Sequence, residues 1–145
     1  MANYECATRT NYFRVKDPEA FRKFMGRVYG GCELEVWEGK DAAGNIQFGF
    51  GCYDGISGYE PESPEAADDD CDYGYDEFLE ALQQHIAEDD AVIILECGHE
   101  KLRYIIASAI IVTSKDIESL DACDIAASRA AVLLNNPSWC TKCDY

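Results

Sequence analysis

Hydrophobic and polar positions along the chain alternate between strand-like and helix-like patterns. Residues 4–15 are rich in Tyr, Thr, Phe and Val, which is typical of a strand. Asp17 and Pro18 then predict a helix start, with Asp as the N-cap and Pro at the first helical position. Apolar side chains follow at helical spacing, at Phe21, Phe24, Met25 and Val28. Gly30 and Gly31 are expected to end this helix.

The middle of the chain predicts a hairpin, a long loop and a second helix. Residues 32–38 alternate between apolar and acidic positions, and residues 46–53 read as the returning strand of the hairpin. From residue 55 to residue 74 the composition changes to Gly, Pro, Ser, Asp and Glu without an apolar period, which predicts a long loop. Residues 75–88 then show one apolar and one acidic helix face.

The last third of the chain predicts a central hairpin and a final helix. Residues 91–97 and 102–113 are apolar runs around a short turn, and their continuous apolarity indicates that both faces of the sheet are covered there. The last helix, capped by Ser114 or Asp121, is expected to reach about Leu134, and its alanines suit close packing on the sheet. The pattern therefore predicts one α+β domain over residues 1–145. It contains a mainly antiparallel sheet of about five strands and three helices, in the order β-α-β-β-α-β-β-α.

The charge balance narrows the possible partners. The 145 residues contain 12 Lys and Arg against 28 Asp and Glu, a net charge of −16. Because nucleic acids and anionic membranes are themselves polyanions, direct binding to either is not expected. No apolar run approaches the ~20 residues that span a bilayer, and the first ten residues lack the pattern of a secretory signal. We therefore expect a cytoplasmic protein.

The negative charge is concentrated in one part of the chain. Residues 41–100 contain 17 acids and neither Lys nor Arg, whereas the other 85 residues contain 12 bases and 11 acids. Ten of the acids fall within residues 60–80, which we call the acidic segment: Glu60, Glu62, Glu65, Asp68, Asp69, Asp70, Asp72, Asp76, Glu77 and Glu80. Tyr59 and Tyr73 border the loop, and tyrosine is favoured at protein interfaces. We expect these ten acids and two tyrosines to bind a partner.

Three interpretations of the acidic segment are open. It is a solvated loop without a partner, or Asp68, Asp69, Asp70 and Asp72 bind a divalent cation, although their spacing lacks the glycine of a calcium loop. In the third interpretation it docks into a basic protein groove. A row of carboxylates can approach the charge density of duplex DNA, one charge per ~1.7 Å of axis, and so compete with nucleic acid. Concentrating like charges in one segment lowers the stability of the fold. This cost favours the third interpretation, because a docking surface gives the charges a function.

Cysteine and histidine provide the other candidate chemistry. The eight cysteines are expected to be reduced, several of them as small core residues. Cys97 and His99 are two positions apart and would form a thiolate–imidazole pair, or join Cys140 and Cys143 as zinc ligands. A lone Cys-x-x-Cys is a weak signal for zinc, so we predict neither a metal nor a cofactor. The sequence shows no nucleophile with a base and a third residue to orient that base, so we predict no catalytic residue. His85, at the edge of the second helix's apolar face, is expected to be partly buried.

Three segments carry a resemblance: residues 11–15 (NYFRV), 48–53 (FGFGCY) and 98–104 (GHEKLRY). They are similar to segments of small acidic proteins carried on mobile elements of gut Firmicutes, and the resemblance extends over most of the chain. Such proteins often antagonise host defence; they include anti-CRISPR and antirestriction proteins, some of which mimic DNA. The resemblance implies a non-enzymatic inhibitor that blocks the basic groove of a CRISPR effector or restriction nuclease in the bacterial host.

Two alternatives to inhibition stay open at this point. In one, the protein is a homodimer in which the strand faces around Ile93 and Ile110 meet across a two-fold axis, and the acidic loop only solubilises it. In the other, the chain is a small zinc or thiol protein that uses the cysteines and His99.

Overall fold

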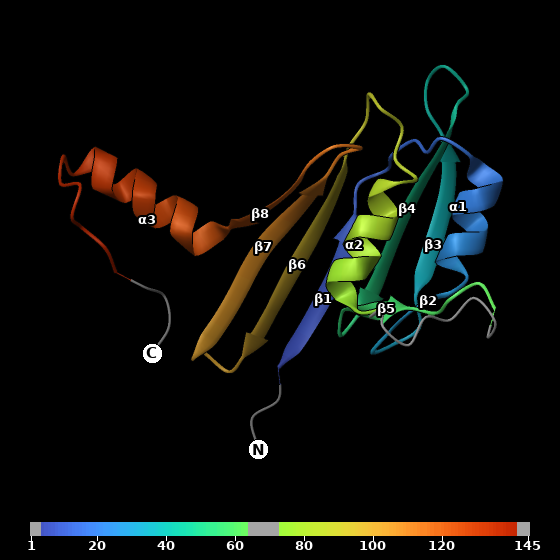
Figure 1. The fold of residues 1–145 in the computed structure, drawn as a ribbon. Coiled ribbons are helices and arrows are strands. Elements are labelled where there is room, and N and C mark those ends of the chain that lie inside the picture. The colour runs from blue at the N-terminus through green and yellow to red at the C-terminus, as the bar shows by residue number, and fades with distance from the viewer. Residues whose placement is uncertain (1–3, 64–72, 142–145) are drawn as a thin grey trace.

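Six strands form one antiparallel sheet in the order β3-β4-β1-β6-β7-β8, in a computed structural model that describes residues 4–63 and 73–141 (Figure 1). Two short strands, β2 and β5, pair separately. The strands are β1 (Glu5–Thr10), β2 (Val28–Gly30), β3 (Glu35–Lys40), β4 (Ile46–Tyr53), β5 (Ile56–Tyr59), β6 (Val92–Glu100), β7 (Tyr104–Val112) and β8 (Ile117–Asp121). The helices are α1 (Pro18–Met25), α2 (Tyr75–Gln83) and α3 (Ala122–Leu133). The predicted α+β class with a mainly antiparallel sheet is confirmed.

The helix starts follow the capping residues. The Asp17 carboxylate accepts hydrogen bonds from the backbone N–H groups of Glu19 and Ala20, at 3.0 and 3.4 Å, and Pro18 is the first residue of α1. Asp121 caps α3 by accepting a hydrogen bond from the backbone N–H of Asp124 at 3.0 Å. Ser114 is therefore not the cap of the last helix, because residues 117–121 pair with β7 as an edge strand before the helix begins.

Three strands, β2, β5 and β8, were not expected. Each is stabilised by its hydrogen bonds to another strand rather than by a strand-like pattern of its own. α1 ends at Met25, and Val28 and Tyr29 pair with β5, which lies inside the expected loop. A three-residue strand has too little pattern to be visible in a sequence, and its hydrogen bonds come from a distant partner. The first strand ends at Thr10 rather than at residue 15, and the central hairpin turns at residues 101–103.

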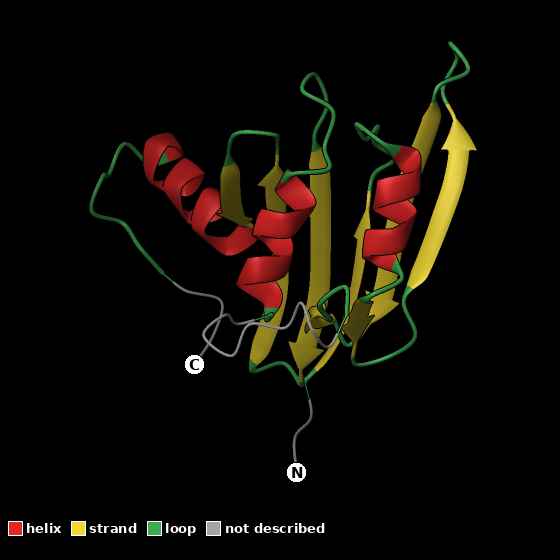
Figure 2. Ribbon diagram, turned by 45° about the vertical axis from the view of Figure 1, so that its right-hand side comes forward, coloured by secondary structure: helices red, strands yellow, loops and turns green. Residues whose placement is uncertain are grey.

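The core lies between one face of the sheet and the helices α1 and α2, which cover that face (Figure 2). Phenylalanine dominates it, at Phe13, Phe21, Phe24, Phe48, Phe50 and Phe78, all at most 2% exposed. Strand β6 places Val92 and Ile94 in the core, whereas Ile93 and Leu95 on its other face are 39% and 53% exposed. The expectation that both faces of this hairpin are covered is therefore wrong within the described residues.

The last helix also departs from expectation. Instead of packing on the sheet, α3 extends outward beyond β8, at the opposite end of the sheet from α1 (Figure 1). None of its residues is buried. Alanine permits close packing but does not produce it, and the large apolar side chains of α3, Ile125, Val132 and Leu133, are exposed rather than turned toward the sheet.

The register of β6 and β7 corrects the expected dimer surface. Ile93 lies opposite Ile111, and Ile94 lies opposite Ile110. Directly opposed residues of antiparallel strands point to the same face, so Ile93 and Ile110 point to opposite faces of the sheet. Ile110 packs against the core. No single surface contains both residues.

Among the described residues, no helix has the length and apolarity needed to cross a bilayer.

Candidate acidic interface

The two ends of the acidic segment's loop are fastened together. The backbone N–H of Tyr59 donates to the carbonyl oxygen of Tyr73 at 3.1 Å, and the two rings meet edge to face with centroids 5.3 Å apart. A Cβ on Gly58 would lie 2.0 Å from the Tyr73 carbonyl oxygen, so only glycine allows this approach. Tyr59 before the loop and Tyr73 after it therefore lie side by side, next to the start of α2.

Both tyrosines expected to bind a partner are half-buried anchors. The Tyr59 ring packs against the core residue Phe24, with centroids 5.5 Å apart. The Arg27 guanidinium lies 5.9 Å from the centre of the Tyr59 ring and donates to the main-chain oxygen of Glu60 at 2.8 Å. Arg27 therefore holds the main chain at the start of the segment and does not pair with the Glu60 carboxylate.

Five of the ten acids in the segment lie within the described residues. Glu60, Glu62, Asp76 and Glu80 are exposed and Glu77 is half-buried. On α2, Asp76 and Glu80 face solvent one turn apart, because Phe78, Leu79 and Leu82 occupy the buried face. No ion pair between described residues includes any of these five carboxylates. Glu65, Asp68, Asp69, Asp70 and Asp72 lie outside the described residues.

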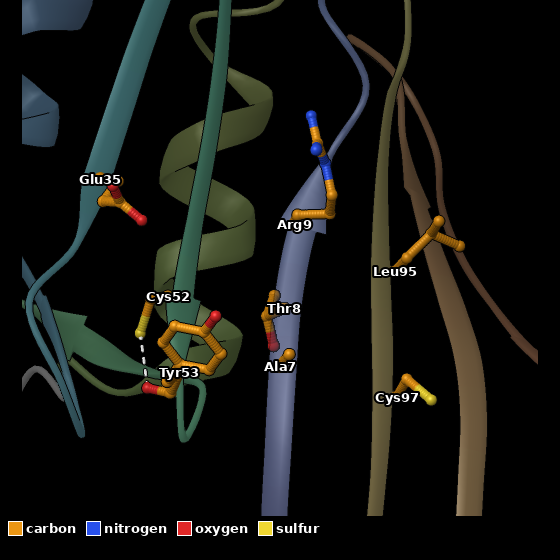
Figure 3. A pocket seen from close by; sticks show the side chains of 8 residues that line it. All are labelled: Ala7, Thr8, Arg9, Glu35, Cys52, Tyr53, Leu95 and Cys97. Atoms are coloured by element: carbon orange, nitrogen blue, oxygen red, sulfur yellow. Dashed lines mark hydrogen bonds between the residues drawn. The ribbon is translucent and has the colours of Figure 1, made fainter.

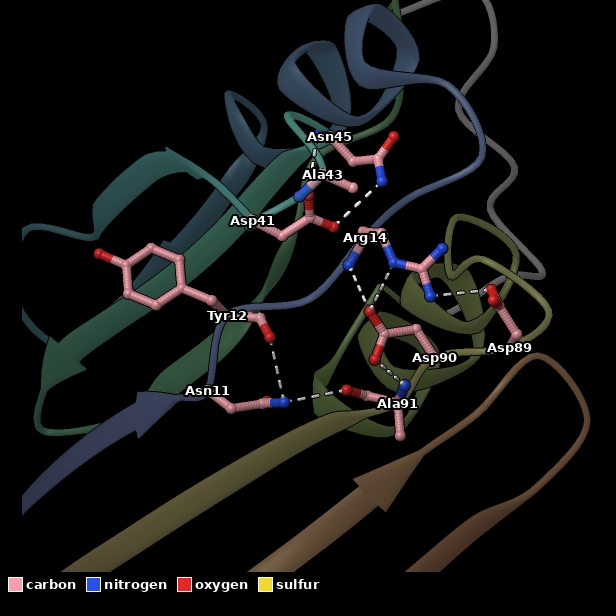
Figure 4. Close-up of polar contacts among 9 residues, drawn as sticks. All are labelled: Asn11, Tyr12, Arg14, Asp41, Ala43, Asn45, Asp89, Asp90 and Ala91. Atoms are coloured by element: carbon pink, nitrogen blue, oxygen red, sulfur yellow. Dashed lines mark hydrogen bonds and ion pairs between the residues drawn. The ribbon is translucent and has the colours of Figure 1, made fainter.

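Other acids from the base-free stretch are used inside the fold, around Arg14 (Figure 4). The Arg14 guanidinium contacts Asp89 at 3.0 Å and holds the pKa of that carboxyl below its usual range. The Asp90 carboxylate accepts from the backbone N–H groups of Arg14 and Ala91, both at 2.8 Å. Asp41 accepts hydrogen bonds from the backbone and side chain of Asn45, which lower its pKa.

The exposed acids of the segment end toward α1, where basic side chains lie. Arg22 pairs with Glu38 at 2.7 Å and with Glu19, Lys23 follows on the same helix, and Arg27 lies just after its end. A groove between α1 and the start of the segment is lined by both Arg27 and Glu62. Among the described residues of the acidic segment, the carboxylates of Glu60 and Glu62 and those on the exposed side of α2 have no ion-pair partner.

His85 lies between the two helices. Its ring stacks on Phe24 with centroids 4.8 Å apart and meets Phe21 edge to face at 5.9 Å. Burial lowers the pKa of this histidine. The expected partial burial of His85 is confirmed, but α2 ends at Gln83 rather than near residue 88, so His85 follows the helix instead of lying on its apolar face.

A pocket opens on the sheet face that lacks helices. It is lined mainly by apolar atoms of β1, β4 and β6, and its walls include Arg9, Cys52, Tyr53, Leu95 and Cys97 (Figure 3). Beside it the Trp37 ring lies across β4, where a Cβ on Gly51 would come within 2.9 Å of the ring. The glycines of β4 therefore permit close approach, as their position in a strand predicts.

The candidate zinc ligands do not converge in the described part of the chain. Cys97 and His99 are both exposed on the open face of β6, and Cys140 follows α3. Cys143 lies outside the described residues. Over residues 4–63 and 73–141, no group of three or more His, Cys, Asp or Glu side chains is arranged to hold a metal ion.

Two thiols are held in their neutral form. The Cys32 thiol hydrogen-bonds to the Asp54 carboxylate at 3.3 Å, which raises the pKa of Cys32. Burial raises the pKa of Cys6, and the Glu96 carboxylate adds to the effect. Because the thiolate is the reactive form, neither position is activated as a nucleophile.

Comparison with known proteins found no family model, no curated protein and no solved structure that matches this chain. Its function is therefore inferred from its own residues.

Proposed function

We propose that this protein is a non-enzymatic, cytoplasmic inhibitor of a host defence nuclease, of the anti-CRISPR or antirestriction type. Its acidic segment occupies a basic groove of the nuclease that otherwise binds nucleic acid. The observation that carries the proposal is the set of exposed carboxylates at Glu60, Glu62, Asp76 and Glu80, which have no ion-pair partner among the described residues.

The acids of α2 support mimicry of a row of phosphates. The nine residues of α2 span about 13 Å at 1.5 Å per residue and include three acids, about one charge per 4–5 Å. One strand of duplex DNA places a charge every 3.4 Å. The helix alone therefore comes close to the linear charge density of a nucleic-acid strand, and the preceding loop adds seven more acids within the segment.

The energetic cost of this arrangement supports a role in binding. Like charges at i,i+4 destabilise an isolated helix by about 0.2–0.5 kcal/mol per pair, and Asp76 and Glu80 have this spacing. A net charge of magnitude about 2–8 already keeps a small domain soluble. The other acids of the same stretch, such as Asp89 and Asp90, are paired with Arg14. Solubility alone does not explain why the described acids of the segment lack ion-pair partners among the described residues.

The proposal is tested with two charge-reversal variants of equal net charge. The segment variant replaces Glu60, Glu62, Asp76 and Glu80 by Lys. The scattered variant replaces four exposed acids outside the segment by Lys, namely Glu5, Glu33, Glu88 and Asp116. Each variant and the wild-type protein is immobilised and exposed to a bacterial lysate, and bound proteins are eluted with increasing salt.

We expect the wild-type protein and the scattered variant to capture a nuclease that elutes steeply with salt, and the segment variant to lose it. If all three proteins capture the same partner with the same salt dependence, the segment is only a solubilising loop. Retention that does not respond to salt would equally exclude competition with polyanions.

A further inference from the structure

Helix α3 turns its large apolar side chains to solvent and contacts the rest of its own chain only through small ones. Of its twelve residues only Asp124 and Arg129 are charged, and Ile125, Val132 and Leu133 are 53%, 65% and 72% exposed. The half-buried residues are Cys123, Ala127, Ala130 and Ala131. Large apolar side chains that gather on an exposed surface commonly mark an interaction site. Helices of about 12–15 residues are marginal in water by themselves, so the stability of α3 has to come from packing.

Among the described residues, no strand pairs with the outer edge of β8, the strand that leads into α3. β8 is the last strand of the six-stranded sheet, so its outer edge presents unpaired backbone groups. It contains neither Lys, Arg nor Pro, which commonly protect such an edge. Ile117 on this strand is 38% exposed. β8 and α3 thus form one continuous unit with exposed apolar side chains at this end of the molecule, which we call the C-terminal unit.

The C-terminal unit carries only a small part of the negative charge of this acidic chain. Residues 104–141 contain two bases and four acids, out of a net charge of −16 for the whole chain. The charged residues of β8 and α3 themselves are Glu118, Asp121, Asp124 and Arg129. Helix α2 and its acids lie away from the end at which α3 projects (Figure 1). Two copies therefore repel each other only weakly at this unit, where their exposed apolar side chains can pack together.

From these observations we propose that the protein is a two-fold homodimer, in which β8 and α3 of one copy pack against β8 and α3 of the other. The interface differs from a surface around Ile93 and Ile110, which the sheet register excludes. The proposal does not depend on the function of the acidic segment.

The register of β8 fits such a pairing. If two antiparallel copies of β8 are centred on Ser119, Glu118 lies opposite Leu120 and Asp121 lies opposite Ile117. No acid then faces another acid across the two-fold axis. Pairing the two edges also satisfies the backbone groups that are unpaired in one copy.

The apolar area is of the size that a stable dimer needs. The exposed fractions of Ile117, Ile125, Val132, Leu133 and Leu134 range from 38% to 72%. Together they leave roughly 500 Å² of apolar surface, against the ~800 Å² of total surface that each partner gives to a standard interface, of which somewhat more than half is apolar. The alanines and the edge backbone contribute further area.

The test compares two Leu→Asp substitutions in the full chain. Leu133 in α3 is 72% exposed, and Leu102 in the β6–β7 turn is 83% exposed, so Leu102→Asp is a matched control for Leu133→Asp. Molar mass is measured by sedimentation over protein concentrations from about 1 to 500 μM, a range that covers the affinities of ordinary dimers. Amide hydrogen exchange in α3 is followed at both ends of that range.

We expect the wild-type protein and Leu102→Asp to be dimers with protected α3 amides, and Leu133→Asp to dimerise at least 100-fold more weakly. A wild-type protein that stays monomeric throughout would overturn the proposal and leave α3 to a different partner. A dimer that Leu133→Asp does not weaken would also overturn it, because its interface would lie elsewhere. Full protection of α3 in dilute monomer would show that the helix needs no second copy.

Discussion

Two groups of carboxylates from the same base-free stretch behave differently in this fold. Asp89 and Asp90 join the chain before β6 to Arg14 in the chain after β1, and Asp41 accepts hydrogen bonds that close the turn between β3 and β4. Glu60, Glu62 and Asp76 make no such contacts with described residues. Acidity in the sequence therefore has two roles here, one that stabilises the fold and one directed outward.

The difference can be traced to the neighbours that each group meets. Arg14 follows β1 and lies beside the loop that precedes β6, so its guanidinium contacts the carboxylates of Asp89 and Asp90. The acids along α2 project from a face that has no base on its own helix. Removing the first group should therefore affect stability, and removing the second should affect binding.

The largest effect is expected from the segment variant with Lys at Glu60, Glu62, Asp76 and Glu80. Its affinity for the captured nuclease should fall at least 100-fold, about 2.7 kcal/mol of binding free energy, since four attractive contacts become repulsive. Thermal unfolding of the same variant should stay at or above the wild-type midpoint. If affinity and folding fell together, the two groups would not have separate roles.

The next largest effect is expected on stability, when the Asp90 carboxylate is removed. Asp90→Ala removes the acceptor of two backbone N–H groups, those of Arg14 and Ala91, and should lower the free energy of unfolding by about 2 kcal/mol. Chemical denaturation measures this change. Glu80→Ala is the matched control and should change stability by less than about 0.5 kcal/mol, because an exposed side chain without a partner is removed.

Lowering the pH should distinguish the two groups next. Hydrogen bonds and Arg14 hold the pKa values of Asp41 and Asp89 below their values in the unfolded chain. Their contribution to stability is therefore present above about pH 4 and is lost as the pH falls through the lowered values. The difference in unfolding free energy between the wild-type protein and an Asp41→Asn, Asp89→Asn variant should shrink over that range. A constant difference would contradict a role for the ionised carboxylates.

Salt should have the smallest effect. Raising the ionic strength screens repulsion within the acidic segment, so wild-type stability should rise slightly, by less than about 1 kcal/mol. The segment variant should gain less from the same salt. Equal gains in both proteins would show that repulsion in the segment is not a measurable cost.

Local signals in the sequence were sufficient for part of the fold. Asp17 and Pro18 start α1 as predicted, and the apolar face of α2 is buried as predicted. The strands β2 and β5 were missed because each depends on a distant partner rather than on its own pattern. The continuous apolarity of β6 and β7 was read as double burial, yet Leu95 remains 53% exposed.

The candidate site was only partly visible in the sequence. The acids of the segment could be counted, but the pinning of Tyr59 to Tyr73 depends on tertiary contacts through Gly58. Tyr59 and Tyr73 were expected to contact a partner, but both are partly buried within the protein and pack against each other. The exposed surface of α3 was missed, because the alanines of the helix were read as a packing face and Ile125, Val132 and Leu133 were not considered.

The most direct test of the central claim is competition with nucleic acid for the captured nuclease. A labelled duplex is bound to the purified nuclease, and its fluorescence anisotropy is followed as the wild-type protein or the segment variant is added. The account predicts that the wild-type protein displaces the duplex stoichiometrically, and more weakly as salt rises, whereas the segment variant does not. A ternary complex in which the duplex stays bound would contradict it.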